Sequence, residues 1–188
     1  MFAGAQQYEP LSASVRGALH KAVSDSRPSV SSFHSSMEAV EWLTEMSRRL
    51  EKRIPSRGYR IDLLRSIHYE ATRAGLDPQL VLGLMQVESG FRKYAVSSAG
   101  ARGYMQVMPF WVKLIGQPED SLFDLRTSLR YGCTILRHYL DIEKGDIFRA
   151  LGRYNGSLGK AEYPNMVRAA WQNQWAYEKT TRLSQAGR

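Results

Sequence analysis

Residues 77–90 read Asp77-Pro78-Gln79-Leu80-Val81-Leu82-Gly83-Leu84-Met85-Gln86-Val87-Glu88-Ser89-Gly90. Aspartate followed by proline is a typical helix start, because the Asp77 side chain can cap the helix and proline suits its first position. From Gln79 to Glu88 the segment is apolar on nearly every side, which predicts a helix buried in the middle of a domain. Gly90 is a natural helix terminator. We therefore expect Glu88 at the carboxyl end of this buried helix.

Helical patterns lie on both sides of this segment. Ser35 and Glu38 have the spacing of a capping box, and apolar residues follow at three- and four-residue steps as far as Ile54. Further helices are expected from about Tyr59 to Gly75, from about Leu125 to Lys144, from Asp146 to Gly156, and from Pro164 through Trp171, Trp175 and Tyr177. Strand alternation and internal repeats are not evident. The sequence therefore predicts an all-α fold.

The first 56 residues differ from the rest of the chain. The stretch from Ser24 to Ser36 holds seven serines in thirteen positions together with Pro28, a composition typical of a flexible linker or loop. The first 56 residues carry 7 basic and 6 acidic residues, whereas the remainder carries 19 and 12. We expect an N-terminal extension at 1–56, with a Ser-rich linker and one amphipathic helix, followed by the main domain at 57–188.

The net charge narrows the classes of partner. With 26 Lys and Arg against 18 Asp and Glu, the formal charge is +8, which favours polyanions such as nucleic acid, anionic lipid or an acidic polysaccharide or peptide mesh. The sequence contains no basic-region helix, no zinc finger and no aromatic-and-basic nucleic-acid signature. Nucleic acid is therefore not an expected partner.

Other simple sites are also excluded. The single cysteine, Cys133, cannot form an intramolecular disulfide or a cysteine-based zinc site. The four histidines show none of the spacings of zinc enzymes, and phosphate-loop and calcium-loop patterns are absent, so we expect no metal and no cofactor. The longest apolar run, from Leu80 to Met85, is too short to cross a bilayer, and no signal peptide is visible at Met1-Phe2.

Glu88 is the residue with the strongest chemical prediction. At the end of a buried helix, apolar surroundings disfavour its charge and the negative end of the helix dipole repels it. Few cations lie near it in sequence. All three effects raise its pKa, so we expect a carboxylic acid that can still donate a proton near neutral pH.

Three motifs in order resemble one enzyme family. They are Glu88-Ser89-Gly90-Phe91, the loop Ser97-Ser98-Ala99-Gly100-Ala101-Arg102-Gly103-Tyr104-Met105-Gln106-Val107-Met108-Pro109, and Arg153-Tyr154-Asn155-Gly156. Together they resemble the lytic transglycosylases of the soluble, goose-lysozyme-like type, glycoside hydrolase family 23. The resemblance covers about residues 77–165 and implies an all-α, lysozyme-like (goose-type) helical domain. Residues 57–188 would then be the catalytic domain.

The resemblance also implies an activity. It is cleavage of the β-1,4 bond between N-acetylmuramic acid and N-acetylglucosamine in peptidoglycan, with closure of a 1,6-anhydro ring on the muramoyl sugar. Glu88 would be the one catalytic carboxyl group, first acid and then base, and Ser97 and Tyr154 would hydrogen-bond at or near it. The residues implied to line the saccharide groove or shape its floor are Ser89, Phe91, Tyr104, Met105, Gln106 and Asn155. The substrate implies a periplasmic or cell-envelope location.

Two alternatives remain open at this point. A lysozyme-like hydrolase on the same fold would need a second carboxylate, such as Asp77 or Asp120, to position water. A catalytically silent glycan-binding module would need no buried acid, which the set of Glu88, Ser97 and Tyr154 argues against. The oligomeric state does not follow from the sequence.

Overall fold

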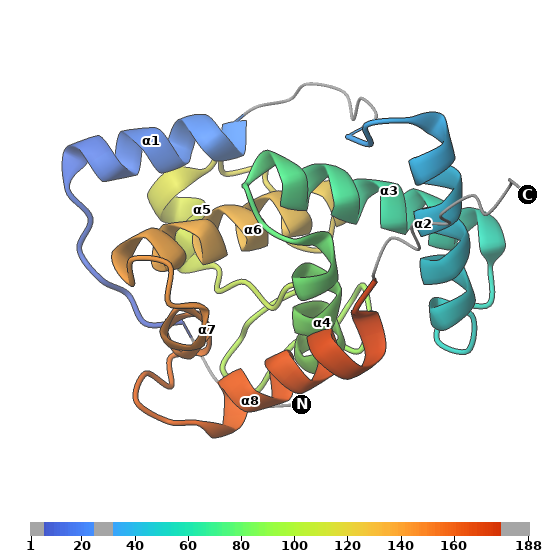
Figure 1. Cartoon of the computed structure of the whole chain (residues 1–188). Helices are drawn as coiled ribbons and strands as arrows, with labels where there is room; N and C mark the ends of the chain where they lie inside the picture. Colours follow the sequence, from blue (N-terminus) through green and yellow to red (C-terminus); the bar gives the residue numbers. More distant parts are fainter. Residues whose placement is uncertain (1–5, 25–31, 178–188) are drawn as a thin grey trace, which may run out of the picture.

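The computed structural model describes residues 6–24 and 32–177, and in this part of the chain every regular element is a helix. The elements are α1 (Ala13–Ser24), α2 (Ser36–Leu50), α3 (Arg57–Arg73), α4 (Pro78–Glu88), α5 (Phe110–Ile115), α6 (Leu125–Ile142), α7 (Ile147–Asn155), α8 (Glu162–Ala170) and the π-helical turn η1 (Trp171–Trp175). Isolated β-bridges join Val96 to Arg102 and Arg102 to Val107. The predicted all-α class is confirmed (Figure 1).

Helix α4 lies inside the fold, as its apolar sequence predicts. It packs against α3, α8 and η1, and its residues from Leu80 to Met85 are all buried. Gly83 permits the close approach to η1, because a Cβ atom there would lie 2.9 Å from the main-chain nitrogen of Trp171. The position of Glu88 is therefore set by a helix fixed on several sides.

The predicted helix ends are confirmed where local capping chemistry fixes them. The Asp77 side chain accepts from the Gln79 N–H at 2.8 Å at the start of α4, and the Ser35 hydroxyl accepts from the Glu38 N–H at 3.1 Å at the start of α2. Gly156 ends α7 with a φ of 71°, a conformation that favours glycine.

The last helix differs from its prediction. It begins at Glu162, two residues before Pro164, because the N–H groups of a first helical turn have no helical partner and proline is tolerated there. It does not continue as one α-helix to Tyr177 but changes to a π-helical turn at Trp171–Trp175. In that turn the indole N–H of Trp171 reaches Asp77 and that of Trp175 reaches Gln86, each at 3.0 Å.

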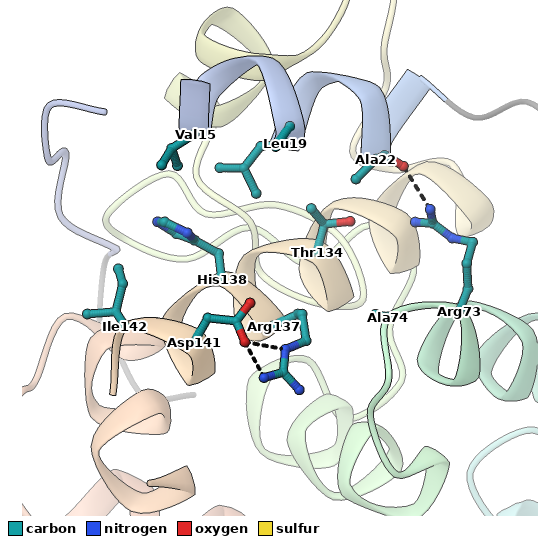
Figure 2. A pocket seen from close by; sticks show the side chains of 11 residues that line it. Val15, Leu19, Ala22, Arg73, Ala74, Thr134, Arg137, His138, Asp141 and Ile142 are labelled. Atoms are coloured by element: carbon teal, nitrogen blue, oxygen red, sulfur yellow. Dashed lines mark hydrogen bonds and ion pairs between the residues drawn. The ribbon is translucent and has the colours of Figure 1, made fainter. Parts of the chain in front are cut away.

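Two helices were not predicted, α1 and α5. Helix α1 packs on α5 and α6 through buried Leu19 and Val23. Beneath it lies a cavity of about 560 Å³ between α1 and α6. Figure 2 shows the Arg73 guanidinium donating to the Ala22 carbonyl oxygen, at 2.9 Å, at one end of this cavity. Most of the predicted Ser-rich linker, residues 25–31, lies outside the described residues.

One core joins the helices before and after residue 57. Leu19 of α1, Trp42 of α2 and Leu82 of α4 belong to the same buried apolar cluster. Between α3 and α6 this core encloses a charged group, since fully buried Glu70 accepts from the guanidinium groups of Arg130 and Arg73 at 2.8 Å each. Among the described helices, none combines the length and apolarity needed to cross a membrane.

Candidate active site

Glu88 is the last residue of α4, and only 6% of its surface is exposed. Ser89 follows it and fixes the helix end to the glycine-rich loop. The Ser89 hydroxyl contacts the carbonyl oxygens of Met85 at 3.2 Å and Tyr104 at 2.8 Å. The predicted location of the carboxyl group at a buried helix end is confirmed, and Ser89 acts there through its contact with the loop.

The surroundings of Glu88 raise its pKa to about 8, because burial removes water from the charged form. One contact opposes this shift. The Tyr163 hydroxyl donates a hydrogen bond to Glu88 Oε1 at 2.5 Å, which favours the carboxylate. Burial has the larger effect, so Glu88 keeps its proton at neutral pH. This is the direction of shift that the sequence predicts.

Tyr163 takes the contact that the sequence assigned to Tyr154. The Tyr154 hydroxyl donates instead to the carbonyl oxygen of Met105 at 2.8 Å. Both tyrosines are fully buried, and burial together with the Glu88 charge raises the pKa of each hydroxyl. Tyr154 is therefore close enough to Glu88 for the charge of Glu88 to raise the pKa of the Tyr154 hydroxyl, but the expected hydrogen bond between the two side chains is not formed. The sequence carries no local signal for Tyr163, which lies 75 residues beyond Glu88.

Ser97 closes the loop on itself rather than contacting the acid. Its hydroxyl accepts from the Ala101 N–H at 3.1 Å, and its own N–H donates to the Ala101 carbonyl oxygen at 3.0 Å. Within residues 6–24 and 32–177 no hydrogen bond joins Ser97 to Glu88. The structure thus gives Ser97 a role in loop shape.

Gln106 has an unusual environment within this loop. It is buried with a φ of 48°, and its side-chain N–H groups donate to the carbonyl oxygens of Ala95 at 3.1 Å and Gly103 at 3.0 Å. Its Oε1 atom is buried and accepts no hydrogen bond in the described structure. The side-chain oxygen of Gln106 is therefore free to accept a hydrogen bond.

Tyr104 and Met105 differ from their predicted place in a groove, because both side chains lie in the core. The Tyr104 hydroxyl pairs with that of Tyr59, and the Met105 side chain fills the space that glycine leaves at position 132 of α6. Their contribution to the site comes from the main chain, whose carbonyl oxygens accept from Ser89 and Tyr154. Large apolar side chains beside a loop favour burial over exposure.

The two remaining predicted residues are also buried. Phe91 packs edge-on against Trp175 with ring centroids 5.6 Å apart, so it supports the turn after Glu88 from within. Asn155 is the last residue of α7 and 5% exposed. It follows Tyr154 directly in the chain.

Neither candidate second carboxylate is free for catalysis beside Glu88. Asp77 caps α4 at the end opposite to Glu88, roughly 16 Å away for an eleven-residue helix. Asp120 accepts from the Tyr131 hydroxyl at 2.5 Å and from the Gln117 N–H at 3.0 Å. In the described part of the chain, no three His, Cys, Asp or Glu side chains gather as metal ligands.

Comparison with known proteins places the chain in a family. Residues 65–175 match the family described as the transglycosylase SLT domain. The chain belongs to this family, as the sequence motifs predict.

Among similar proteins, a "Transglycosylase" of Enterobacteria phage PRD1 is 36% identical over 88 residues, covering 47% of this chain and 32% of the phage protein. A "Membrane-bound lytic murein transglycosylase C" of Histophilus somni is 43% identical over 109 residues, covering 50% of this chain and 30% of that protein. The chain thus spans about a third of the length of these relatives.

Solved structures include the lytic transglycosylase Slt of Pseudomonas aeruginosa, with a TM-score of 0.46 at 28% identity over 63% of this chain and 19% of that one. The 70 kDa soluble lytic transglycosylase of Escherichia coli has a TM-score of 0.45 at 18% identity over 72% and 24% of the two chains.

Proposed function

We propose that this chain is a peptidoglycan lytic transglycosylase, which cleaves the β-1,4 bond between N-acetylmuramic acid and N-acetylglucosamine and leaves a 1,6-anhydromuramoyl end. The observation that carries the proposal is the buried acid Glu88 at the end of α4, whose pKa is raised to about 8. A carboxyl group that stays protonated at neutral pH is suited to donate a proton to a glycosidic oxygen. Membership of the transglycosylase SLT domain family supports the same reaction.

In the proposed first step, Glu88 protonates the glycosidic oxygen while the bond from that oxygen to C1 of the muramoyl sugar breaks. In the second step the Glu88 carboxylate takes the proton of the muramoyl C6 hydroxyl, whose oxygen forms a bond to C1. Glu88 ends protonated again, and the products together have the composition of the substrate. Because the nucleophile is part of the substrate, one carboxyl group suffices, in contrast to ordinary glycosidases, which use two.

The neighbours of Glu88 are proposed to position groups rather than to react. Tyr163 orients the carboxyl through its 2.5 Å hydrogen bond. Tyr154 and Ser89 hold the main chain at Met105 and Tyr104. The free Oε1 atom of Gln106 is proposed to accept a hydrogen bond from the glycan. Ser97, Phe91 and Asn155 are proposed to shape the loop and turn around the bound sugar.

The hydrolase alternative has less support, because Asp77 and Asp120 are both committed to structural contacts away from Glu88. A silent binding module is also less consistent with Glu88, since a buried acid with a raised pKa destabilises the fold at neutral pH. A glycan-binding module without catalytic activity gains nothing from this loss of stability.

The proposed substrate also implies a location and an electrostatic contribution to binding. Peptidoglycan carries many carboxylates, and the formal charge of +8 favours association with it. We propose action in the cell envelope, with residues 57–188 as the catalytic part. Binding to purified sacculi should weaken as salt is added, and binding that is insensitive to salt would contradict this electrostatic contribution.

The test is a digest of purified sacculi by the wild-type protein and by Glu88→Gln, with products identified by mass spectrometry. Wild type should release anhydro-muropeptides, which are one water lighter than hydrolytic products. Glu88→Gln keeps the shape of the side chain and removes its exchangeable acid, so turnover should fall by at least about a thousandfold. Hydrolytic products from wild type, or substantial turnover by the folded variant, would overturn the proposal.

A further inference from the structure

Gln6 binds the main chain of the glycine-rich loop with its side-chain amide. Its Nε2 atom donates to the carbonyl oxygen of Gln106 at 3.2 Å, and its Oε1 atom accepts from the Met108 N–H at 2.9 Å. Only 5% of Gln6 is exposed. A glutamine outside any helix, 100 residues before its partner Gln106, is therefore as buried as a core residue.

The residues after Gln6 extend this contact along one side of the molecule. The Tyr8 ring packs edge-on against Phe110, with centroids 5.9 Å apart, and the Glu9 carboxylate pairs with Arg153 at 3.0 Å. Figure 1 shows the segment before α1 passing beside α7. We refer to residues 6–9 as the N-terminal strap.

The strap contacts the loop that carries Gln106, a residue proposed to bind the glycan. The carbonyl oxygen that Gln6 binds belongs to Gln106, and the preceding residue, Met105, accepts the hydrogen bond of Tyr154. Arg153, which pairs with the strap, immediately precedes Tyr154 in α7. The strap thus binds main-chain groups of the same loop that Ser89, the residue after Glu88, contacts at the Tyr104 carbonyl oxygen.

The chemistry of the Gln6 contact resembles that of an N-acetylated sugar. A carboxamide offers one carbonyl acceptor and an N–H donor, and the acetamido group of N-acetylglucosamine or N-acetylmuramic acid offers the same two functions. The Gln106 carbonyl oxygen and the Met108 N–H are therefore suitable partners for the Gln6 side chain or for an acetamido group. The two ligands cannot bind these main-chain groups at the same time.

We propose that the N-terminal strap is an autoinhibitory contact, in which Gln6 occupies main-chain positions that an acetamido group of the glycan takes when it binds. This inference rests on the proposed function, because it identifies the glycan as the competing ligand. Glycan binding then requires the strap to leave. The apparent affinity is therefore the intrinsic affinity multiplied by the fraction of molecules in which the strap is open.

Most of the strap contacts are weak enough for the segment to open. Tyr8 is 62% exposed, so its ring contact buries little surface. The Glu9 side chain is 49% exposed, and exposed ion pairs contribute little to stability. The two hydrogen bonds of Gln6 are the buried contacts, so Gln6 is the residue whose replacement should open the strap.

The test compares Gln6→Ala with Gln7→Ala, a matched control because Gln7 is the neighbouring glutamine and is exposed. Both are made in the full chain with Glu88→Gln, so that no turnover occurs, and binding of the N-acetylglucosamine tetramer is measured by calorimetry. Gln6→Ala should bind about fivefold or more tightly than its parent, as expected when two hydrogen bonds of ordinary strength no longer hold the strap closed. Gln7→Ala should bind as its parent does.

Two further readouts complete the experiment. In nuclear magnetic resonance spectra of the Glu88→Gln protein, saturating tetramer should shift the Gln6 side-chain amide signals toward those of a solvated glutamine. With Glu88 intact, Gln6→Ala should lower KM for sacculi and leave kcat nearly unchanged. Unchanged or weaker affinity in Gln6→Ala, no binding to any variant, or unshifted Gln6 signals would overturn the strap proposal.

The two proposals fail in distinguishable ways. If wild type releases anhydro-muropeptides but Gln6→Ala changes neither affinity nor KM, the autoinhibitory contact is wrong and the proposed function stands. If Gln6→Ala tightens tetramer binding but wild type cleaves no sacculi, the strap stands and the proposed activity is wrong.

Discussion

The hydroxyl of Tyr163 donates a 2.5 Å hydrogen bond to Oε1 of Glu88, and the two groups meet in the interior where α8 packs on α4. This contact opposes the effect of burial on the Glu88 pKa, which nevertheless rises to about 8. The carboxyl group is therefore both oriented and protonated at neutral pH. These two properties decide how the site should respond to mutation and to pH.

The stability of the fold should depend on pH through Glu88. In the folded state its pKa is about 8, and the reference value for the unfolded chain is 4.5. Between these values the unfolded chain releases a proton that the folded protein keeps, so stability is lost as pH rises through this window, by up to about 1.4 kcal/mol per pH unit.

Urea unfolding at pH 5 and pH 7.5 checks this prediction. Glu88→Gln removes the titrating group and should flatten the pH dependence, and it should be more stable than wild type at pH 7 by up to roughly 3 kcal/mol. Glu41→Gln, which changes an exposed glutamate of α2, serves as control and should follow wild type. A Glu88→Gln protein with the same slope as wild type would show that Glu88 ionises freely in the fold.

The two buried tyrosines should be separable by the pH profile of activity. If Glu88 is the general acid, kcat/KM should fall above about pH 8, where the acid loses its proton. Tyr163→Phe removes a hydrogen bond that favours the carboxylate, so this alkaline limb should move to higher pH while the rate falls through loss of orientation.

Tyr154→Phe is the matched control for this shift. It removes the hydrogen bond to the Met105 carbonyl oxygen and leaves the Tyr163 contact intact, so the rate should fall with little change in the position of the limb. Equal displacement of the limb in both variants would contradict the separate roles that the geometry assigns to the two hydroxyls.

The charged group between α3 and α6 should be important for stability. Glu70 is fully buried and pairs with Arg130 and Arg73. Glu70→Gln leaves both guanidinium groups facing a neutral amide, and the free energy of unfolding should fall by about 3–5 kcal/mol. Denaturant titration measures this change.

A second charged group provides the comparison. Glu45 pairs with Arg48 and Arg49 on the surface of α2, so Glu45→Gln should cost less than about 1 kcal/mol. Similar losses for the two variants would mean that burial adds nothing to the Glu70 group.

The parts of the fold that the sequence predicts are those with local signals. Asp77 and Gly156 act on residues within a few positions of themselves, so the helix ends they define can be read directly. Helix α5 has six residues and α1 has only two buried apolar side chains, which is too little for a periodic pattern. The π-helical turn at Trp171–Trp175 depends on tertiary packing against α4, which no local pattern specifies.

The same distinction between local sequence signals and tertiary packing applies to the candidate site. The burial of Glu88 and the direction of its pKa shift follow from one helix and its apolar sequence. The hydroxyl that contacts Glu88 could not be predicted, because the choice between Tyr154 and Tyr163 depends on how α7 and α8 pack on α4. The resemblance of the loop motif implies that Tyr104 lines the saccharide groove, whereas tertiary packing places its side chain in the core.

Gly83 should be needed for the approach of α4 to η1. A Cβ atom at this position would lie 2.9 Å from the main-chain nitrogen and 3.1 Å from the Cα atom of Trp171. Main-chain atoms cannot turn aside as a flexible side chain does, so Gly83→Ala should destabilise the fold by about 1–3 kcal/mol through overpacking. Since η1 follows α8, which carries Tyr163, the same change should displace Tyr163 from Glu88 and lower activity.

Gly58→Ala is the control for this substitution, because Gly58 is also helical and a Cβ atom there meets nothing within 4 Å. Alanine at this exposed position should leave stability unchanged or raise it by up to about 1 kcal/mol, through its better helix propensity and a less flexible unfolded chain. Thermal unfolding followed by tryptophan fluorescence compares the stability of the two variants. A Gly83→Ala protein as stable and as active as Gly58→Ala would show that α4 and η1 can separate without affecting the site.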